Sequence, residues 1–501
     1  MHWNELLKAI GNTLVIGAGT ALFAVPLGTL LAVLLLRTNV AGARLGWLML
    51  SSQLVVPLYV FAGGWSAGFG TLGWWPLAPA NLQFAELRSI LAVVFIHAVA
   101  AVPWVCLIVS LGLAWSARSL EELAMLENGW RGVLRQVTLP SLVPWIALAS
   151  VWSVAPVLTE MVVTNLYQVR TIPEQVYLDI SLHGTSHWTL VAGICGCACP
   201  LALVLLVVVR QLPQRQPAAR NSPHSFHRQP SYSLAAARIG SSIGVWCVIS
   251  ALVGMPIANL IYKAGWEVVP QIQYGATHRW SIYRFWLTIV ETSTGFAAEV
   301  YWSTLLAAGS ATLAMMLAGL MAYLRKRLGV PWLFYAVCIL MVSVPGPVAG
   351  QWVTWLFNTV GWDVMLSLYD RTLLAPILAQ QFRLLPLGYL LVNTILSGID
   401  RQTWELAELD SLSRVNIVWR IVLPQTGWAW IVAWIVLAAL SAGELSTILL
   451  VLPPGVTTLS QRLFEFLHFG MRYQDSGLCL GLIIVGWFVA LAAWNTRKGF
   501  Q

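Results

Sequence analysis

Two short segments of the chain cluster acidic residues, although the whole chain has only 20 aspartates and glutamates among 501 residues. The clustered acids are Glu121, Glu122, Glu127, Asp400, Glu405, Glu408 and Asp410. Carboxylates on a surface helix accept charge-assisted hydrogen bonds from basic groups of a partner. Neither a His-Glu-x-x-His metal motif nor a convincing nucleophile–base constellation occurs in the sequence. The two segments therefore favour recognition of a partner over catalysis, and we predict no catalytic residue and no metal site.

The two acidic segments occupy equivalent places in a repeated pattern of prolines, glycines and acids. In the first half, the pattern pairs Leu14 with Gly28, Pro103 with Glu122 and Pro140 with Glu160. In the second half, it pairs Leu305 with Gly319, Pro386 with Glu405 and Pro424 with Glu444. Corresponding pairs have the same separations in both halves. This shared order predicts an internal duplication.

Each acidic segment is expected to begin as a short amphipathic helix. Ser119 and Glu122 have the spacing of a capping box, and Asp400 can cap the second helix. A turn should follow, and then a further helix that ends at Leu139-Pro140 or Leu423-Pro424. Because a long apolar run begins at each Leu-Pro, both acidic segments should lie at the ends of apolar helices.

The composition indicates what those apolar helices are. Hydrophobic residues make up 58% of the chain and charged residues only 10%, whereas soluble domains carry roughly 25% charged residues. These proportions exclude a water-soluble fold and favour a membrane protein. The net charge of +8 is then a record of membrane sidedness, and we predict no nucleic-acid partner.

We expect an all-α polytopic membrane protein with about 11 transmembrane helices, because runs of roughly 20 apolar residues span a bilayer. The expected spans are residues 12–37, 46–70, 89–114, 141–163, 188–209, 239–262, 300–324, 330–357, 372–396, 426–450 and 477–496. Five helices per repeat is an odd number, so a directly joined second copy would be inverted. The extra helix at 239–262 restores the orientation and gives two parallel five-helix repeats.

The expected domains follow from this division. Residues 1–210 form the first transmembrane half, residues 211–238 a cytoplasmic linker, and residues 239–501 the second half. The linker has four prolines and several arginines but no acid, which is typical of a flexible connection. Placing it in the cytoplasm puts most of the 28 basic residues on that side, as the positive-inside rule requires. The N-terminus is then expected outside.

Both acidic segments resemble the EAA motif of ABC importer permeases, which reads Glu-Ala-Ala, then a Gly six residues after the Glu, and later Leu-Pro. The second copy matches at Glu405, Ala407 and Pro424, with Leu406 in place of the first Ala and Ser411 in place of the Gly, and Asp410 is a further acid of this docking segment. The first copy has its own set of matching residues, and its Glu-to-Pro span is one residue shorter. These residues are Glu122, Ala124, Asn128 at the Gly position, Gly129 beside it, and Pro140.

The resemblance implies that each motif helix docks on a separate ABC ATPase subunit, present in two copies. It also implies an extracytoplasmic solute-binding protein as partner and a multi-pass location in the cell's inner membrane, in contact with lipid. The chain has no Gly-x-x-x-x-Gly-Lys-[Ser/Thr] loop, so we expect it to be no enzyme: ATP would be hydrolysed by the partner, and this chain would bind no cofactor.

Two motif copies in one chain resemble the fused permeases of iron(III)-type and thiamine-type importers. The sequence from Gly443-Glu444 to Pro454-Gly455 is also similar to that branch. The resemblance points first to iron(III) as the transported solute and leaves thiamine, a phosphonate or another small anion open. An ion-coupled secondary transporter is the alternative from another class, but it would not need paired acidic segments.

Apart from Arg37, the last residue of the first expected span, the charged residues within expected spans are Glu160, Arg383 and Glu444. An intramembrane charge is costly unless it faces a cavity, water or a polar partner. Each residue is therefore a candidate for lining the transport pathway. For Glu160 and Glu444 the alternative is snorkelling to the interface or a structural hydrogen bond. For Arg383 it is interhelical pairing, and the sequence does not choose.

Overall fold

A computed structural model of the chain gives two compact units, and each is described here by itself. Unit 1 comprises Met1–Phe296 with Leu463–Trp487, and unit 2 comprises Ala297–Arg462 with Phe488–Gln501. The structure describes residues 3–70, 73, 85–115, 118–184, 191, 193–211, 233–234, 237–271, 275–359, 362–399, 402–404, 414–470 and 473–499.

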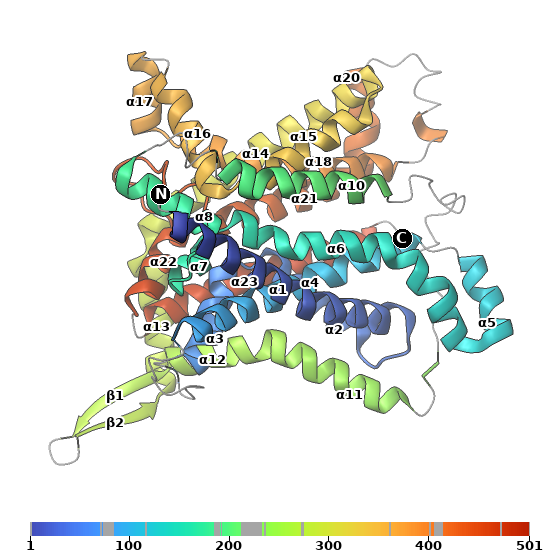
Figure 1. Cartoon of the computed structure of the whole chain (residues 1–501), viewed down its shortest axis with the longest axis horizontal. Helices are drawn as coiled ribbons and strands as arrows, with labels where there is room; N and C mark the ends of the chain where they lie inside the picture. Colours follow the sequence, from blue (N-terminus) through green and yellow to red (C-terminus); the bar gives the residue numbers. More distant parts are fainter. Residues whose placement is uncertain are drawn as a thin grey trace. The chain divides into compact units, whose positions relative to one another are not determined.

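Unit 1 is built almost entirely of helices (Figure 1). In chain order they are α1 (Trp3–Arg37), α2 (Ala43–Ser52), η1 (Gln53–Val55), α3 (Leu58–Phe69), α4 (Ala85–Trp115), α5 (Arg118–Gly132), η3 (Val133–Thr138), α6 (Leu139–Thr159), α7 (Val162–Leu166), α8 (Ile172–His183), η4 (Ile194–Ala198), α10 (Cys199–Gln211), α11 (Arg238–Ile249), η7 (Ser250–Gly254), α12 (Met255–Ala264) and α13 (Ile282–Gly295). Most of α22 (Leu459–Phe469) and the first half of α23 (Gln474–Gly499) also belong to this unit.

Helices α1, α4 and α6 form the centre of unit 1 and pack against one another. Small residues bring their backbones close together. A Cβ atom on Gly28 of α1 would lie 2.6 Å from the Val105 side chain of α4, and one on Gly112 of α4 would lie 2.5 Å from the Trp145 ring of α6. These glycines fix how closely the three helices approach.

The extra helix, α11 to α12, packs on α3 within unit 1. The Asn259 amide donates a hydrogen bond to the Gly64 carbonyl oxygen over 3.1 Å, and Gly68 lies directly against Asn259. The compact units therefore group the chain differently from the expected division at residues 211–238. The reason is that small residues on α3 give the extra helix a close-packed partner in the first half.

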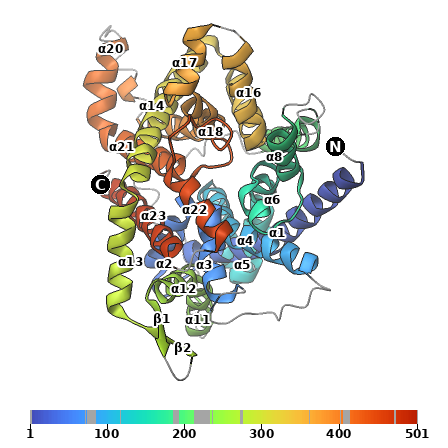
Figure 2. The same cartoon turned by 90° about the vertical axis from the view of Figure 1, so that its left-hand side faces the viewer.

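A two-stranded antiparallel hairpin departs from the all-α expectation. Strand β1 (Trp266–Gln271) pairs with β2 (Gly275–Trp280), and Trp266 lies opposite Trp280. The hairpin joins α12 to α13 and extends away from both helices (Figure 2). This stretch lies between the expected spans 239–262 and 300–324.

Unit 2 is likewise built of helices. Its helices are α14 (Ala297–Leu328), α15 (Pro331–Ser343), α16 (Gly346–Thr359), α17 (Asp363–Arg371), α18 (Leu374–Ser397), α20 (Arg414–Ile417), η8 (Val418–Val422) and α21 (Leu423–Gly443). Helices α14, α18 and α21 pack against one another, and their buried contact includes Ala311, Ala314, Leu384 and Leu437.

Two expected spans are broken rather than continuous. Residues 46–70 form helices bent by 109°, and residues 330–357 form helices bent by 102°. Each break falls at the residue before a proline, where Val56 and Val344 have extended backbones with ψ of 126° and 128°. A proline disfavours the helical conformation of the residue before it, so Pro57 and Pro345 explain both bends.

Among the described residues, eight helices are long and apolar enough to cross a membrane, or ten if each bent pair is one span. The chain is thus an α-helical multi-pass membrane protein. The expected span 372–396 corresponds to α18, which is 24 residues long but lies outside this set. Its midpoint carries Gln380, Gln381 and Arg383, which lower its hydropathy, so a total of 11 spans stays a prediction.

Candidate functional site

The first acidic segment folds as a helix, a break and a further helix, as the sequence predicts. Helix α5 is interrupted at Gly129, whose φ of 63° and ψ of −175° are non-helical. Only glycine adopts such a conformation readily. The π-helical turn η3 then leads into α6 at Leu139 and Pro140. The predicted turn at Asn128 and Gly129 is thus made by Gly129, and the Asn128 side chain lies outside the described residues.

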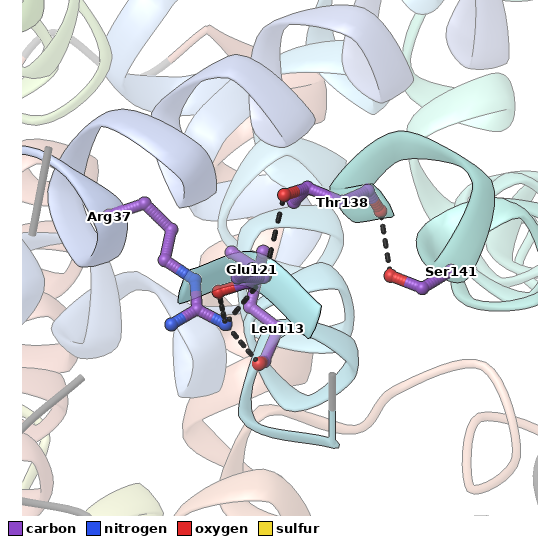
Figure 3. A network of polar contacts seen from close by, with 5 residues as sticks. All are labelled: Arg37, Leu113, Glu121, Thr138 and Ser141. Atoms are coloured by element: carbon purple, nitrogen blue, oxygen red, sulfur yellow. Dashed lines mark hydrogen bonds and ion pairs between the residues drawn. The ribbon is translucent and has the colours of Figure 1, made fainter. Parts of the chain in front are cut away.

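Glu121, on the first turns of α5, points inward and is fully buried. Its carboxylate lies 3.2 Å from the guanidinium of Arg37, the last residue of α1, which is only 2% exposed. The same Arg37 nitrogen, Nη2, donates a 2.8 Å hydrogen bond to the Leu113 carbonyl oxygen near the end of α4. One buried ion pair therefore joins the ends of α1, α4 and α5 (Figure 3).

Thr138 extends this network to the start of α6. Its hydroxyl donates to Glu121 Oε1 over 3.3 Å, and the Ser141 hydroxyl donates to the Thr138 carbonyl oxygen over 2.8 Å. We call Arg37, Leu113, Glu121 and Thr138 the α5 anchor (Figure 3). Burying two charges is favourable only when their geometry and remaining hydrogen bonds are good, so the anchor should hold one arrangement of the four helix ends.

The outward face of α5 carries the residues that the sequence analysis selected. Glu122 is exposed, Ala124 is partly buried, and Pro140 is exposed at the start of α6. Several large apolar side chains of α5 are also exposed, including Leu126, which is 85% exposed. Exposed apolar groups mark surfaces that contact a protein or a membrane, and an exposed carboxylate beside them can pair with a basic group of a partner.

Sequence reasoning chose Glu122 and missed Glu121. A signal for Glu121 was present, because Glu121 precedes Pro140 by the same number of residues as Glu405 precedes Pro424. Counting back from Leu-Pro selects Glu121, whereas counting forward from Pro103 selects Glu122. The structure separates their environments: Glu121 is buried in the anchor and Glu122 is exposed.

Most of the second acidic segment lies outside the described residues. This applies to Asp400, Glu405, Ala407, Glu408, Asp410 and Ser411. The described flanks show Lys326, near the end of α14, with its Nζ atom 5.0 Å from the centre of the Trp404 ring. Beyond the gap, η8 leads into α21 at Leu423 and Pro424, as η3 leads into α6.

Glu160 and Glu444 each terminate a 21-residue helix, α6 and α21 respectively. Glu160 Oε1 accepts a 2.7 Å hydrogen bond from the Val162 backbone N–H. Glu444 Oε1 accepts one of 3.1 Å from the Thr447 backbone N–H. Both carboxylates thus stabilise the backbone turn that follows their helix, which is the structural alternative to lining a pathway.

Arg383 also makes a structural contact. Its Nη1 atom donates a 2.6 Å hydrogen bond to the carbonyl oxygen of Val342, in the last turn of α15. That carbonyl lies just before the bend to α16, where the helical hydrogen-bond pattern ends. On the same helix, Gln380 bonds the Ser441 carbonyl and Gln381 the Ser310 carbonyl. The polar middle of α18 therefore ties α14, α15 and α21 together.

Within the part of the chain that the structure describes, no group of three or more His, Cys, Asp or Glu side chains could hold a metal ion. The seven cysteines are free thiols, of which Cys195, Cys199 and Cys247 are exposed. His97 is buried in α4 and its Nδ1 lies 2.9 Å from the Val93 carbonyl oxygen. His97 therefore makes a hydrogen-bonding contact within its own helix.

Glu174 is a buried acid that the sequence analysis did not select. It lies on α8, outside the candidate spans, and is only 4% exposed. Burial raises the pKa of its carboxyl to about 7, although a hydrogen bond with Asn165 and the charge of Arg170 act in the opposite direction. The folded protein therefore favours the protonated form of Glu174 near neutral pH.

We expect the stability of the protein to fall as pH rises from 5 to 8, in part through Glu174. A raised carboxyl pKa gives a stabilising contribution that is full below the unfolded value of 4.5 and is lost as pH rises through the folded value. One pKa unit corresponds to about 1.4 kcal/mol, so the loss should not exceed about 3 kcal/mol. Thermal unfolding between pH 5 and 8 should show a flatter profile for Glu174→Gln. The exposed control Glu122→Gln should keep the wild-type profile; equal profiles for all three proteins would contradict the assignment.

No family model, curated protein or solved structure matches this chain. Its function must therefore be argued from its own residues and their arrangement.

Proposed function

We propose that this chain is the transmembrane permease subunit of an ATP-binding-cassette importer. The single observation that carries the proposal is the arrangement of α5. This short helix lies outside the candidate spans, exposes Glu122 and apolar side chains, and is tied through buried Glu121 to three membrane helices. A docking helix needs these two faces, because one must meet the partner and the other must transmit its movement.

The repeated order of elements supports a parallel duplication. Each unit has a long first helix, a bent pair, a further long helix, a π-helical turn before Leu-Pro, and a 21-residue helix that ends at a glutamate. In this proposal α18 corresponds to α4 and is the eleventh span, even though it is more polar. Two equivalent acidic segments would then dock two copies of the ATPase.

The proposed mechanism is alternating access. Closure of the ATPase dimer on ATP would move both docking helices and rock the two repeats, opening the pathway to the outer side. The chain would lie in the cell's inner membrane with its linker in the cytoplasm. An extracytoplasmic solute-binding protein would deliver the solute, and the partner would hydrolyse ATP.

Iron(III) is the solute that the fused arrangement of two motif copies favours, with thiamine, a phosphonate or another small anion as alternatives. The hydrogen bonds of Glu160, Arg383 and Glu444 favour structural roles for them and so give no support to any one solute. Stimulation of ATP hydrolysis by the solute-loaded binding protein, measured in the reconstituted complex, would distinguish the solutes.

We expect Glu405→Lys to lower co-purification of the ATPase and solute uptake by about tenfold or more, because like charges facing each other across an interface cost several kcal/mol. Glu122→Lys should act in the same direction on the other segment. Asp363→Lys is the matched control, because Asp363 is an exposed acid on α17, which lies on the predicted outer side. Normal assembly and uptake in both glutamate variants would overturn the docking assignment.

A further inference from the structure

We propose that Arg37 and Glu121 are positioning residues that make the first docking helix, α5, move as one body with α1 and α4. The inference rests on the proposed function, because it explains how a force applied to α5 reaches the membrane helices. It assigns adjacent glutamates to different tasks: Glu122 faces the partner, and Glu121 holds the helix to the membrane part of unit 1.

The break at Gly129 makes such an anchor necessary. A helix that continues into α6 only through a non-helical glycine could pivot there, and a pivot would absorb the movement of a docked partner. Glu121 precedes this break in the chain and Thr138 follows it. The Glu121 carboxylate accepts a hydrogen bond from the Thr138 hydroxyl. It also accepts a hydrogen bond from Arg37 over 3.2 Å. The Glu121–Thr138 hydrogen bond therefore bridges the break, and the Arg37–Glu121 contact joins α5 to α1 (Figure 3).

Burial makes the bridge stiff. Glu121 is 0% exposed and Arg37 is 2% exposed, so neither side chain can exchange its partner for water without opening the helix ends. Arg37 Nη2 is shared between Glu121 and the Leu113 carbonyl oxygen, so a displacement of α5 pulls on α1 and α4 together. A solvent-exposed ion pair, in contrast, contributes little stability and would not hold the helix in one position.

Unit 2 has a basic contact at the equivalent place. Trp404 directly precedes Glu405, as Glu121 directly precedes Glu122. The Nζ atom of Lys326, close to the end of α14, lies 5.0 Å from the Trp404 ring centre. A cation near the end of the first long helix thus contacts the residue before the docking glutamate in both units. The chemistry differs, with an ion pair in one unit and a cation–π contact in the other.

Two spin labels test whether α5 and α1 move together. Leu126→Cys on α5 and Leu30→Cys on α1 place labels at exposed positions, with Cys195, Cys199 and Cys247 changed to serine to remove the other exposed thiols. We expect one narrow inter-label distance by pulsed electron resonance. It should be the same for the permease–ATPase complex without nucleotide and with ATP and vanadate. In Glu121→Gln the distribution of inter-label distances should become broad, whereas in Glu122→Gln it should stay narrow.

Two further variants separate an anchor from a general folding defect. The exchanged pair Arg37→Glu with Glu121→Arg restores the ion pair but not the donor to the Leu113 carbonyl oxygen, so its distance distribution should be narrower than that of Glu121→Gln. Thr138→Val removes only one hydrogen bond to Glu121 and should also broaden the inter-label distance. This variant serves as the test if Glu121→Gln fails to fold. A distance that changes with nucleotide in the otherwise wild-type complex, or one that stays narrow in both Glu121→Gln and Thr138→Val, would overturn the inference.

The outcomes also distinguish this inference from the proposed function. If no ATPase co-purifies with the wild-type chain, the permease assignment fails. The nucleotide-free distances of wild type and Glu121→Gln still report whether the anchor holds α5. If the ATPase assembles with Glu121→Gln but the distance is unaffected, the permease assignment stands and the anchor fails.

Discussion

Replacing Glu121 with alanine is expected to lower the free energy of unfolding by about 3–5 kcal/mol, the cost of removing one partner from a buried ion pair. Arg37 would keep its hydrogen bond to the Leu113 carbonyl oxygen but would lose the carboxylate that balances its charge. Thr138 would lose the acceptor of its hydroxyl. The loss should be measured as a lower unfolding temperature of the detergent-purified protein and as less protein in the membrane.

The neighbouring residue provides the control for this prediction. Glu122→Ala removes an acid from the same helix but from its exposed face, where substitutions usually change stability by about 0.5 kcal/mol or less. The double variant Arg37→Met with Glu121→Met removes both charges, and apolar replacement of a buried pair is often neutral. It should therefore be more stable than Glu121→Ala. Equal stability of Glu121→Ala and Glu122→Ala would show that the anchor contributes nothing to folding.

The membrane class and most helices could be predicted from the sequence because long apolar runs have few alternatives in a bilayer. The expected spans 89–114 and 300–324 correspond to α4 and α14. The bends at Pro57 and Pro345 are not predictable from proline alone, because Pro26, Pro103 and Pro386 lie within continuous helices. Hydropathy averages over a break, so the apolar pattern alone predicts two continuous spans where the structure has two bent pairs.

The candidate site could be located from sequence but not resolved into its two faces. Charge and spacing identify α5, yet they do not distinguish Glu121 from Glu122, because only packing decides which carboxylate meets Arg37, distant in the sequence. The same limit applies to Glu160 and Arg383. Sequence shows that a charge lies in a span, whereas its partner is a backbone atom, Val162 N–H or the Val342 carbonyl, whose position depends on the fold.

Glycines at equivalent positions illustrate how one sequence pattern can serve different packing. Gly28 faces Val105 of α4 in unit 1, and a Cβ on Gly28 would lie 2.6 Å from the Val105 side chain and 3.0 Å from the Val102 carbonyl oxygen. Gly319 follows Leu305 as Gly28 follows Leu14, but a Cβ there would have no atom within 4 Å. In unit 2 the tight approach of α14 to α18 lies at Gly309 of α14, where a Cβ would be 2.8 Å from the Ile377 side chain, and a Cβ on Gly388 of α18 would make ordinary contacts with Ala314 and Ala318.

We therefore expect Gly28→Ala to destabilise the protein by about 1–3 kcal/mol, as overpacking of a close contact does. Gly319→Ala should be neutral or stabilising by up to about 1 kcal/mol, because alanine favours a helix more than glycine does. Val105 and Gly388 lie at the same distance after Pro103 and Pro386, so Val105→Gly in the Gly28→Ala background places a glycine where unit 2 has Gly388 and makes room for the added methyl group. That second change should recover part of the lost unfolding temperature. Equal unfolding temperatures for Gly28→Ala and Gly319→Ala would mean that α1 and α4 do not approach as closely as the Gly28–Val105 contact requires.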